Sequence, residues 1–172
     1  MPRPIILIGL PGAGKTTVAP HAASLLGAPW CDLDQRIMAT AGKPIPAIFA
    51  DHGEAHFRRL ERLAMQQALA EPPQVIAAGA GWAVQEGNLA AVSGRALILY
   101  MSLTPAQAAS RLGENHDRPL LAGEVPEQRI AELLETRNRW YRLADLEIDV
   151  GRSPPEAVAA GIATAARQYG GW

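Results

Sequence analysis

The sequence predicts an α/β fold in which a five-stranded parallel sheet carries helices on both faces. Short apolar runs alternate with longer helical segments along the chain, and this alternation is typical of parallel strands joined by helical crossovers. The runs at residues 4–8 and 96–101 are apolar throughout, as expected of strands covered on both faces. No linker long enough to separate two domains is present, so residues 1–172 are expected to form one domain.

Each element has its own local signal. Strands are expected at residues 4–8, 29–32, 75–78, 96–101 and 146–150, where apolar residues run together. Helices are expected at residues 15–26, 34–40, 45–51, 54–70, 88–92, 126–144 and 154–168, and another begins with Thr104 as N-cap and Pro105 at its first position. Pro20 should kink the first helix or remove one of its hydrogen bonds. Residues 113–124 lack periodicity and mix charges with glycine and proline, which predicts a mobile lid.

Composition and charge exclude several classes of protein. No apolar run approaches the length of a membrane span and the N-terminus lacks the apolar region of a secretory signal, so a cytoplasmic location without a membrane partner is expected. A net charge of −1 with scattered basic residues argues against a nucleic-acid partner, and we expect a monomer. The single cysteine, Cys31, is expected to be structural. His52 and His56 are four residues apart, but Gly53 intervenes and no third ligand follows, so no metal site is expected there.

The motif with the clearest chemical meaning is GLPGAGKT at residues 9–16, which fits the pattern GxxxxGK[ST] between a predicted strand and a predicted helix. The backbone of such a phosphate-binding loop wraps phosphate groups, its lysine reaches the terminal phosphates and its hydroxyl can ligate magnesium. The chain has fourteen arginines but only two lysines, so the presence of lysine at position 15 is informative. We therefore expect a three-layer P-loop NTPase fold that binds ATP and Mg²⁺, with nucleotide contacts from Gly12, Ala13, Gly14, Lys15, Thr16 and Thr17.

Two aspartates, Asp32 and Asp34, follow the second predicted strand. Ligands of open parallel sheets bind at the carboxyl ends of the strands, so both carboxylates are expected to point towards the phosphate-binding loop. Asp32 is then a candidate for the magnesium site together with Thr16. Asp34 could serve the reaction, or it could be the N-cap of a helix that begins at Gln35, and its position alone favours neither role.

A second pattern of spaced residues covers nearly the whole chain. It comprises Asp32-Leu33-Asp34, Gly42, Ile45, Phe49, Gly53-Glu54, Phe57-Arg58, Glu61, the glycine-rich triplet Gly79-Ala80-Gly81, Arg118 with the residues up to Gly123, and Arg137 with Tyr141. This pattern resembles that of the shikimate kinase family. The resemblance is more specific than the phosphate-binding loop, which many enzymes share.

The resemblance implies a kinase that transfers the γ-phosphoryl group of ATP to the 3-hydroxyl of shikimate in aromatic amino-acid biosynthesis. The substrate-binding segment would span about residues 34–62 and the lid about residues 113–124. The implied catalytic residues are Lys15, Asp34, which orients and deprotonates the acceptor hydroxyl, and Arg118, which closes over the transferred phosphate. Further implied contacts are Arg58, Arg137, Gly79, Ala80 and Gly81 to the substrate carboxylate and ring, with Arg111 and Arg152 beside the adenine.

Other interpretations of these residues stay open. Arg58 and Arg137 are each followed by further arginines, so by pattern alone they could be solvated charges on a helix face. Ala80 replaces the middle glycine of the triplet, and it would cost about 1 kcal/mol if its backbone needed a positive φ. Ala80 and the bulky Trp82 leave room for a related small hydroxy acid as acceptor, aminoshikimate-like or gluconate-like. A non-catalytic nucleotide-binding module is the remaining alternative.

Overall fold

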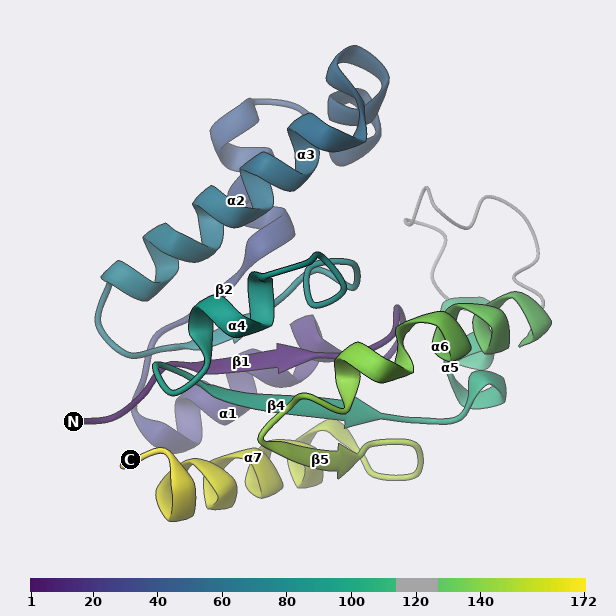
Figure 1. Cartoon of the computed structure of the whole chain (residues 1–172). Coiled ribbons are helices and arrows are strands. Elements are labelled where there is room, and N and C mark those ends of the chain that lie inside the picture. Colours follow the sequence, from purple (N-terminus) through teal and green to yellow (C-terminus); the bar gives the residue numbers. More distant parts are fainter. Residues whose placement is uncertain (114–126) are drawn as a thin grey trace.

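The computed structural model describes residues 1–113 and 127–172, and within them five parallel strands form one sheet (Figure 1). The strands lie in the order β2-β3-β1-β4-β5. Their bounds are β1 (Ile5–Ile8), β2 (Trp30–Asp32), β3 (Val75–Ala77), β4 (Leu97–Ser102) and β5 (Leu146–Asp149). The predicted α/β fold class is confirmed. Most of the predicted lid, residues 114–124 including Arg118, lies outside the described residues.

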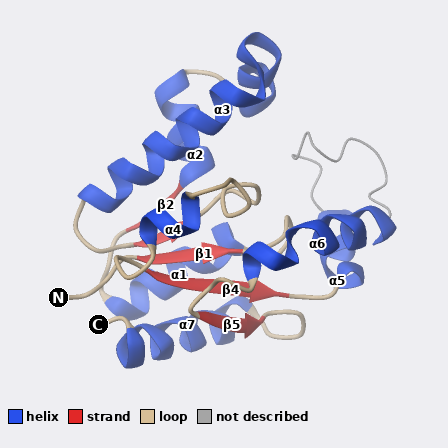
Figure 2. Ribbon diagram, in the orientation of Figure 1, coloured by secondary structure: helices blue, strands red, loops and turns tan. Residues whose placement is uncertain are grey.

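The helices follow the predicted order with small changes in their ends (Figure 2). They are α1 (Lys15–Leu26), α2 (Leu33–Ala41), α3 (Ile45–Ala70), α4 (Asn88–Val92), α5 (Pro105–Gly113), α6 (Glu127–Tyr141) and α7 (Pro155–Tyr169). Helix α6 ends at Tyr141 rather than at residue 144, because Leu143 and Ala144 bond to carbonyls three residues earlier and form a tight turn towards β5. Helix α1 continues past Pro20 to Gly27, which caps it in the left-handed conformation.

The sheet is the middle of three layers. In Figure 1, α1 lies behind the sheet and α4 and α6 lie in front of it, while α7 packs along α1. Every residue of β1 is buried, and its neighbours β3 and β4 are buried nearly throughout. The residues of the edge strand β5 alternate between partly buried and exposed. The apolar runs of the central strands therefore reflect cover on both faces.

Helices α2 and α3 extend beyond the β2 edge of the sheet (Figure 1). Helix α3 is kinked at Gly53, whose φ of 77° and ψ of 174° are not helical. Glycine adopts this positive φ without steric cost. The kink separates the two helices expected at residues 45–51 and 54–70, and the rings of Phe49 and Phe57 pack across it with their centroids 4.7 Å apart.

None of the described helices is both long and apolar enough to cross a membrane. Helix α3 has 26 residues, but charged side chains recur along it.

The start of α5 tests the predicted helix cap. Gln107 N donates to Thr104 Oγ1 at 3.2 Å and Thr104 N donates to Gln107 Oε1 at 2.9 Å, which forms a reciprocal capping box.

We expect Thr104→Ala to lower the free energy of unfolding by about 1 kcal/mol, because it leaves backbone donors of α5 without this partner. Urea denaturation measures the change. Thr164→Ala in the middle of α7 is the matched control and should change stability by less than about 0.5 kcal/mol. Equal losses in the two variants would contradict a capping role for Thr104.

Candidate active site

The phosphate-binding loop joins β1 to α1. Gly12 and Gly14 adopt φ values of 83° and 88°, which glycine tolerates without steric cost. Gly14 is the N-cap of α1, so the first backbone N–H groups of this helix face the loop. Lys15 is only 7% exposed, and its Nζ donates to the carbonyl oxygens of Gly9 at 2.8 Å and Leu10 at 3.0 Å. The loop thus combines a helix N-terminus with a buried cation, and both favour anions.

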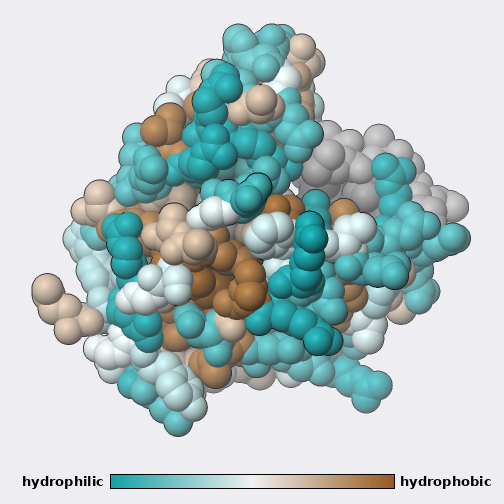
Figure 3. Space-filling model, viewed as in Figure 1, coloured by the Kyte–Doolittle hydropathy of each residue, from teal (hydrophilic) through white to brown (hydrophobic). Residues whose placement is uncertain are grey.

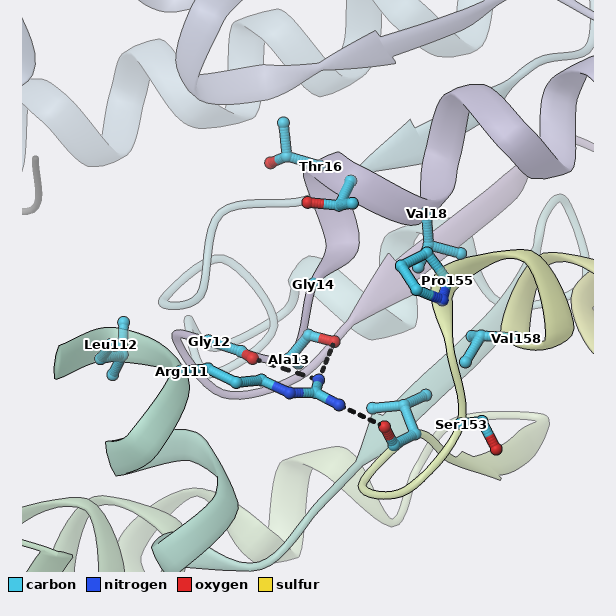
Figure 4. A pocket seen from close by; sticks show the side chains of 12 residues that line it. Gly12, Ala13, Gly14, Thr16, Val18, Arg111, Leu112, Ser153, Pro155 and Val158 are labelled. Carbon is cyan, nitrogen blue, oxygen red and sulfur yellow. Dashed lines mark hydrogen bonds between the residues drawn. The ribbon is translucent and has the colours of Figure 1, made fainter. Parts of the chain in front are cut away.

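A cavity of about 290 Å³ lies beside this loop (Figure 4). Its walls come from the loop, from α1, from the end of α5 and from the segment after β5, and are formed by Gly12, Ala13, Gly14, Thr16, Thr17, Val18, Arg111, Leu112, Val150, Ser153, Pro155 and Val158. Polar loop atoms form one side, while Leu112, Pro155 and Val158 supply apolar surface. This combination suits a molecule with phosphates at one end and a flat base at the other.

Arg111 connects two walls of the cavity. Its Nη1 donates to the carbonyl oxygen of Ala13 at 3.3 Å, and its Nη2 donates to that of Val150 at 2.5 Å (Figure 4). The guanidinium therefore ties the phosphate-binding loop to the end of β5. Arg152, the other arginine predicted near the base, is exposed and is not among the residues that line the cavity.

Asp32 lies against the loop from the end of β2. Its Oδ2 accepts a hydrogen bond from Thr16 Oγ1, and its Oδ1 accepts one from Gln35 N at 3.1 Å. Asp32 is therefore the N-cap of α2, and the interpretation of Asp34 as that cap is wrong. The helix begins one residue earlier than predicted because Asp32 keeps extended backbone angles of −108° and 124° and Leu33 is already helical. Asp34 thus lies in the first turn of α2.

The oxygens of Thr16 and Asp32 are hard donors of the kind that Mg²⁺ prefers. In the described part of the chain no three His, Cys, Asp or Glu side chains are grouped as metal ligands. Magnesium is commonly held by one or two protein oxygens, with water and substrate phosphates completing its shell. The pair therefore fits a magnesium ion that is bound together with a nucleotide.

The glycine-rich triplet follows β3 and passes close to two carboxylates. A β-carbon on Gly79 would lie 2.9 Å from Asp34 Oδ1 and 2.8 Å from Glu61 Oε1, closer than such atoms can approach. A side chain at this position would therefore have to displace one or both carboxylates, and the reason lies in the space available and not in the φ angle of Gly79. Asp34 from α2 and Glu61 from α3 therefore meet at the carboxyl end of β3.

Arg58 lies beside the same triplet. Its Nη1 donates to Glu61 Oε2 at 2.6 Å, while its Nη2 and Nε donate to Glu54 Oε1 at 3.1 and 3.3 Å. A β-carbon on Gly81 would lie 2.7 Å from Arg58 Nη1. A guanidinium has five N–H donors, so these three bonds leave two for a ligand. Arg58 is thus held in place by neighbouring carboxylates and is not a loose charge on a helix face.

Burial shifts the pKa values of Glu61 and Arg58. Glu61 is only 1% exposed, and its burial raises the pKa of its carboxyl above the usual value, although hydrogen bonding and charge attraction from Arg58 oppose the shift. Burial alone would lower the pKa of Arg58, but the hydrogen bonds and charges of Glu61 and Glu54 outweigh it, so the pKa of Arg58 is raised. The arginine keeps its charge, which a site for an anionic ligand requires.

Arg137 reaches the triplet from α6. Its Nη1 donates to the carbonyl oxygen of Ala80 at 2.9 Å, and Tyr141 Oη donates to the same oxygen at 3.3 Å. The Tyr141 ring stacks on Tyr100 of β4 with centroids 4.8 Å apart, and burial raises the pKa of its hydroxyl, which therefore stays protonated as a donor. Arg137 and Tyr141 together fasten the middle of the triplet to α6.

The two unusual residues of the triplet region have plain structural explanations. Within the described residues no side-chain-bearing residue has a positive φ, so Ala80 does not incur the predicted strain. The side chain of Trp82 is 1% exposed and belongs to the hydrophobic core. Its carbonyl oxygen accepts a hydrogen bond from Asn88 Nδ2 at 2.8 Å. Trp82 is therefore a core residue that follows the triplet.

Comparison with known proteins gives consistent results. A family model described as "Shikimate kinase" matches residues 11–167. The shikimate kinase of Salinispora arenicola is 41% identical over 159 residues, which cover 92% of this chain and 94% of that protein. The shikimate kinase of Caldanaerobacter subterraneus subsp. tengcongensis is 39% identical over 155 residues, covering 90% and 91%. This chain belongs to the shikimate kinase family.

A solved structure of a family member agrees in fold. The shikimate kinase from Acinetobacter baumannii, in complex with shikimate, superposes with a TM-score of 0.90 at 32% identity and covers 98% of this chain and 94% of its own. Membership of the shikimate kinase family makes this chain a phosphotransferase with an alcohol group as acceptor. The resemblance predicted from the spaced residues is thereby confirmed.

Sequence reasoning named most of the residues around the triplet but missed how some of them act. Glu54 and Glu61 were part of the family pattern, yet neither was predicted as a partner of Arg58. Their spacing of four and three residues from Arg58 on one helix was the available signal. Tyr141 lies four residues after Arg137 on α6, and this spacing likewise indicated that the two side chains could share a partner. The predicted structural role of Cys31 fits its partial burial, which raises the pKa of its thiol to about 11.

The close approach of Gly81 to Arg58 is testable. In Gly81→Ala the new methyl group must displace the guanidinium, because Nη1 and Nη2 lie 2.7 and 2.8 Å from the position of the β-carbon. We expect the KM for the acceptor to rise by about tenfold or more, since a charged hydrogen bond contributes about 1.5–3 kcal/mol. The KM for ATP should stay unchanged in steady-state assays.

Gly161→Ala in α7 is the matched control, because no atom lies within 4 Å of a β-carbon built there. It should leave both KM values unchanged. An unaltered acceptor KM in Gly81→Ala would show that the position of Arg58 does not matter for the acceptor.

Proposed function

We propose that this chain transfers the γ-phosphoryl group of ATP to the 3-hydroxyl of shikimate, giving shikimate 3-phosphate. The observation that carries the proposal is the arrangement of Asp34, Arg58 and Arg137 around residues 79–81, at the sheet edge that also holds the phosphate-binding loop. One carboxylate and two guanidinium groups around a narrow glycine-rich segment suit an acceptor that carries a hydroxyl and a carboxylate.

The nucleotide would occupy the cavity beside the phosphate-binding loop. Backbone N–H groups of residues 12–17 and the Lys15 ammonium would bind its phosphates, and Arg111 and Arg152 would flank its base. The hydrogen bonds of Arg111 to the loop and to the end of β5 support its part of this role by holding the cavity walls together. Thr16 and Asp32 would hold Mg²⁺, which supplies charge neutralisation at the phosphate oxygens.

The acceptor would lie against residues 79–81. Asp34 would orient its hydroxyl for in-line attack and accept the proton as the bond to phosphorus forms. The two remaining N–H donors of Arg58, together with Arg137, would bind its carboxylate. Because Glu54, Glu61 and the triplet hold these arginines in place, little conformational entropy would be lost when the acceptor binds.

Arg118 would complete the charge neutralisation around the transferred phosphoryl group, as the family resemblance implies. An arginine delivered in this way can contribute about 10³ or more in rate. In this proposal residues 113–124 form the lid that brings Arg118 to the phosphates and excludes water from the reaction.

The related hydroxy acids have less support as acceptors than shikimate. Ala80 and Trp82 depart from the family pattern, but Ala80 is free of backbone strain and the Trp82 side chain is buried in the core. Shikimate is therefore the acceptor that we propose.

A panel of acceptors tests the assignment. With ATP and Mg²⁺ present, coupled ADP detection should show turnover with shikimate well above the background hydrolysis of ATP. An aminoshikimate-like compound and gluconate should give much lower kcat/KM values, because their charge or shape does not match the three anchoring groups. If shikimate failed to stimulate ADP release while gluconate did so, the proposed acceptor would be wrong.

Asp34→Asn tests the role of the carboxylate. The amide keeps the shape of the side chain but cannot accept the proton, so kcat should fall by about 10²–10⁴-fold. The dissociation constant for ATP, measured by calorimetry, should stay within about twofold of the original because Asp34 does not line the nucleotide cavity. Asp51→Asn, at an exposed position of α3, is the control and should leave kcat unchanged. Normal turnover in Asp34→Asn would remove this residue from the mechanism.

A further inference from the structure

A second, open cavity of about 540 Å³ lies between α3 and the segment that follows the glycine-rich triplet. Glu54, Ala55, Arg58, Arg59 and Arg62 line it from successive turns of α3, and Gln85 lines it from the opposite side. Hydrophilic side chains predominate on the visible surface over α3 (Figure 3). The cavity is separate from the nucleotide cavity, with which it shares no residue.

The walls of this cavity are strongly positive for a chain with a net charge of −1. Three guanidinium groups face one carboxylate, that of Glu54, which already accepts hydrogen bonds from Arg58. Arg59 and Arg62 are exposed, and neither forms an ion pair with any carboxylate of the described residues. Arg59 Nη2 lies 3.4 Å from His56 Nδ1. Two cations are thus available to a ligand.

Both walls of the cavity are connected to the glycine-rich triplet. On one side, the Arg58 guanidinium lies against Gly81. On the other side, Gln85 Nε2 donates to the carbonyl oxygen of Gly81 at 3.2 Å. A ligand in the cavity would therefore contact the same arginine that is proposed to bind the acceptor carboxylate, and only two of its N–H donors remain for both ligands.

We propose that this cavity is a second anion site, which binds a phosphate group through Arg59, Arg62 and the outer side of Arg58. A phosphate dianion matches the two unpaired guanidinium groups in charge, whereas a single carboxylate would balance only one. Arg58 would then be shared, so phosphate in this cavity would compete with the acceptor and not with ATP. The competition between phosphate and the acceptor rests on the proposed function, whereas binding of phosphate in this cavity does not depend on it.

Direct binding is the first test. Inorganic phosphate is titrated into the protein with the phosphate-binding loop saturated by ADP and Mg²⁺, and binding is measured by calorimetry at constant ionic strength. The double variant Arg59→Gln/Arg62→Gln should lose about tenfold or more in phosphate affinity, because two charged hydrogen-bonding groups are removed. Arg95→Gln, an exposed arginine between α4 and β4, is the matched control and should bind phosphate like the original chain.

Absence of phosphate binding to the original chain, or equal binding to the double variant, would overturn the site. Glycerol phosphate in a parallel titration distinguishes a phosphate ester from free phosphate as the source of the group. Equal affinities for the two compounds would show that the site recognises the phosphate group alone. If glycerol phosphate bound but inorganic phosphate did not, the site as proposed would be overturned.

The kinetic test addresses the shared arginine. At saturating ATP and constant ionic strength, phosphate should raise the KM for shikimate several-fold without changing kcat. The ratio of KM values with and without phosphate should fall close to one in the double variant and stay at the original value in Arg95→Gln. A ratio that is unchanged in the double variant would overturn the shared use of Arg58. If shikimate gave no turnover at all, the proposed function would fail, while the calorimetric result for the anion site would stand.

Discussion

Burial of β1 between two parallel neighbours is the constraint on which the rest of the structure depends. Ile5, Ile6, Leu7 and Ile8 are at most 1% exposed, and β1 pairs with β3 on one side and β4 on the other. Because all strands are parallel, their carboxyl ends lie together on the same side of the sheet. The phosphate-binding loop follows β1, Asp32 is the last residue of β2, and the glycine-rich triplet follows β3, so the candidate active site lies at these carboxyl ends.

The order of the strands places different groups on the two sides of the phosphate-binding loop. β1 lies between β3, which leads into the triplet, and β4, which leads towards α5 and Arg111. The phosphate-binding loop therefore has the groups that we propose to bind the acceptor on one side and the cavity that we propose for the nucleotide on the other. Thr16 and Asp32 link the loop to the β2 side, and Arg111 links it to the end of β5. In the proposed reaction, the phosphoryl group moves from the nucleotide on the β4 side of β1 to the acceptor on the β3 side.

The buried charge of Glu61 fixes the position of Arg58 beside the glycine-rich triplet. Glu61 is almost fully buried, and such a carboxylate is costly unless a cation and hydrogen bonds compensate it. Arg58 supplies both, and in return its guanidinium keeps one position beside Gly81. The lack of a side chain at positions 79 and 81 is what allows these charged groups to approach the backbone. A cation that is already held in position binds an anion at a lower entropic cost than a freely moving one.

Much of the fold was predictable from local signals. The apolar runs identified the strands, Gly27 ended α1, and Thr104 with Pro105 began α5, because each of these signals acts through neighbouring residues. Asp34 was harder, since an aspartate near a helix start satisfies both a capping and a functional pattern. The decision came from Asp32, whose backbone stays extended and whose carboxylate caps α2. A one-residue shift in a helix start is below the resolution of sequence patterns.

The sequence by itself determined the fold class, the phosphate-binding loop and the family to which the chain belongs, because these are encoded in short motifs and in their order. Only the tertiary structure decided how the motifs meet: that Ala80 is unstrained, that Trp82 lies in the core, and that Arg58 is fastened by Glu54 and Glu61. Only the structure placed Arg59 and Arg62 on a cavity with Gln85. Each of these facts depends on contacts between elements far apart in the chain, or on the direction in which a side chain points, and neither is recorded in residue spacing.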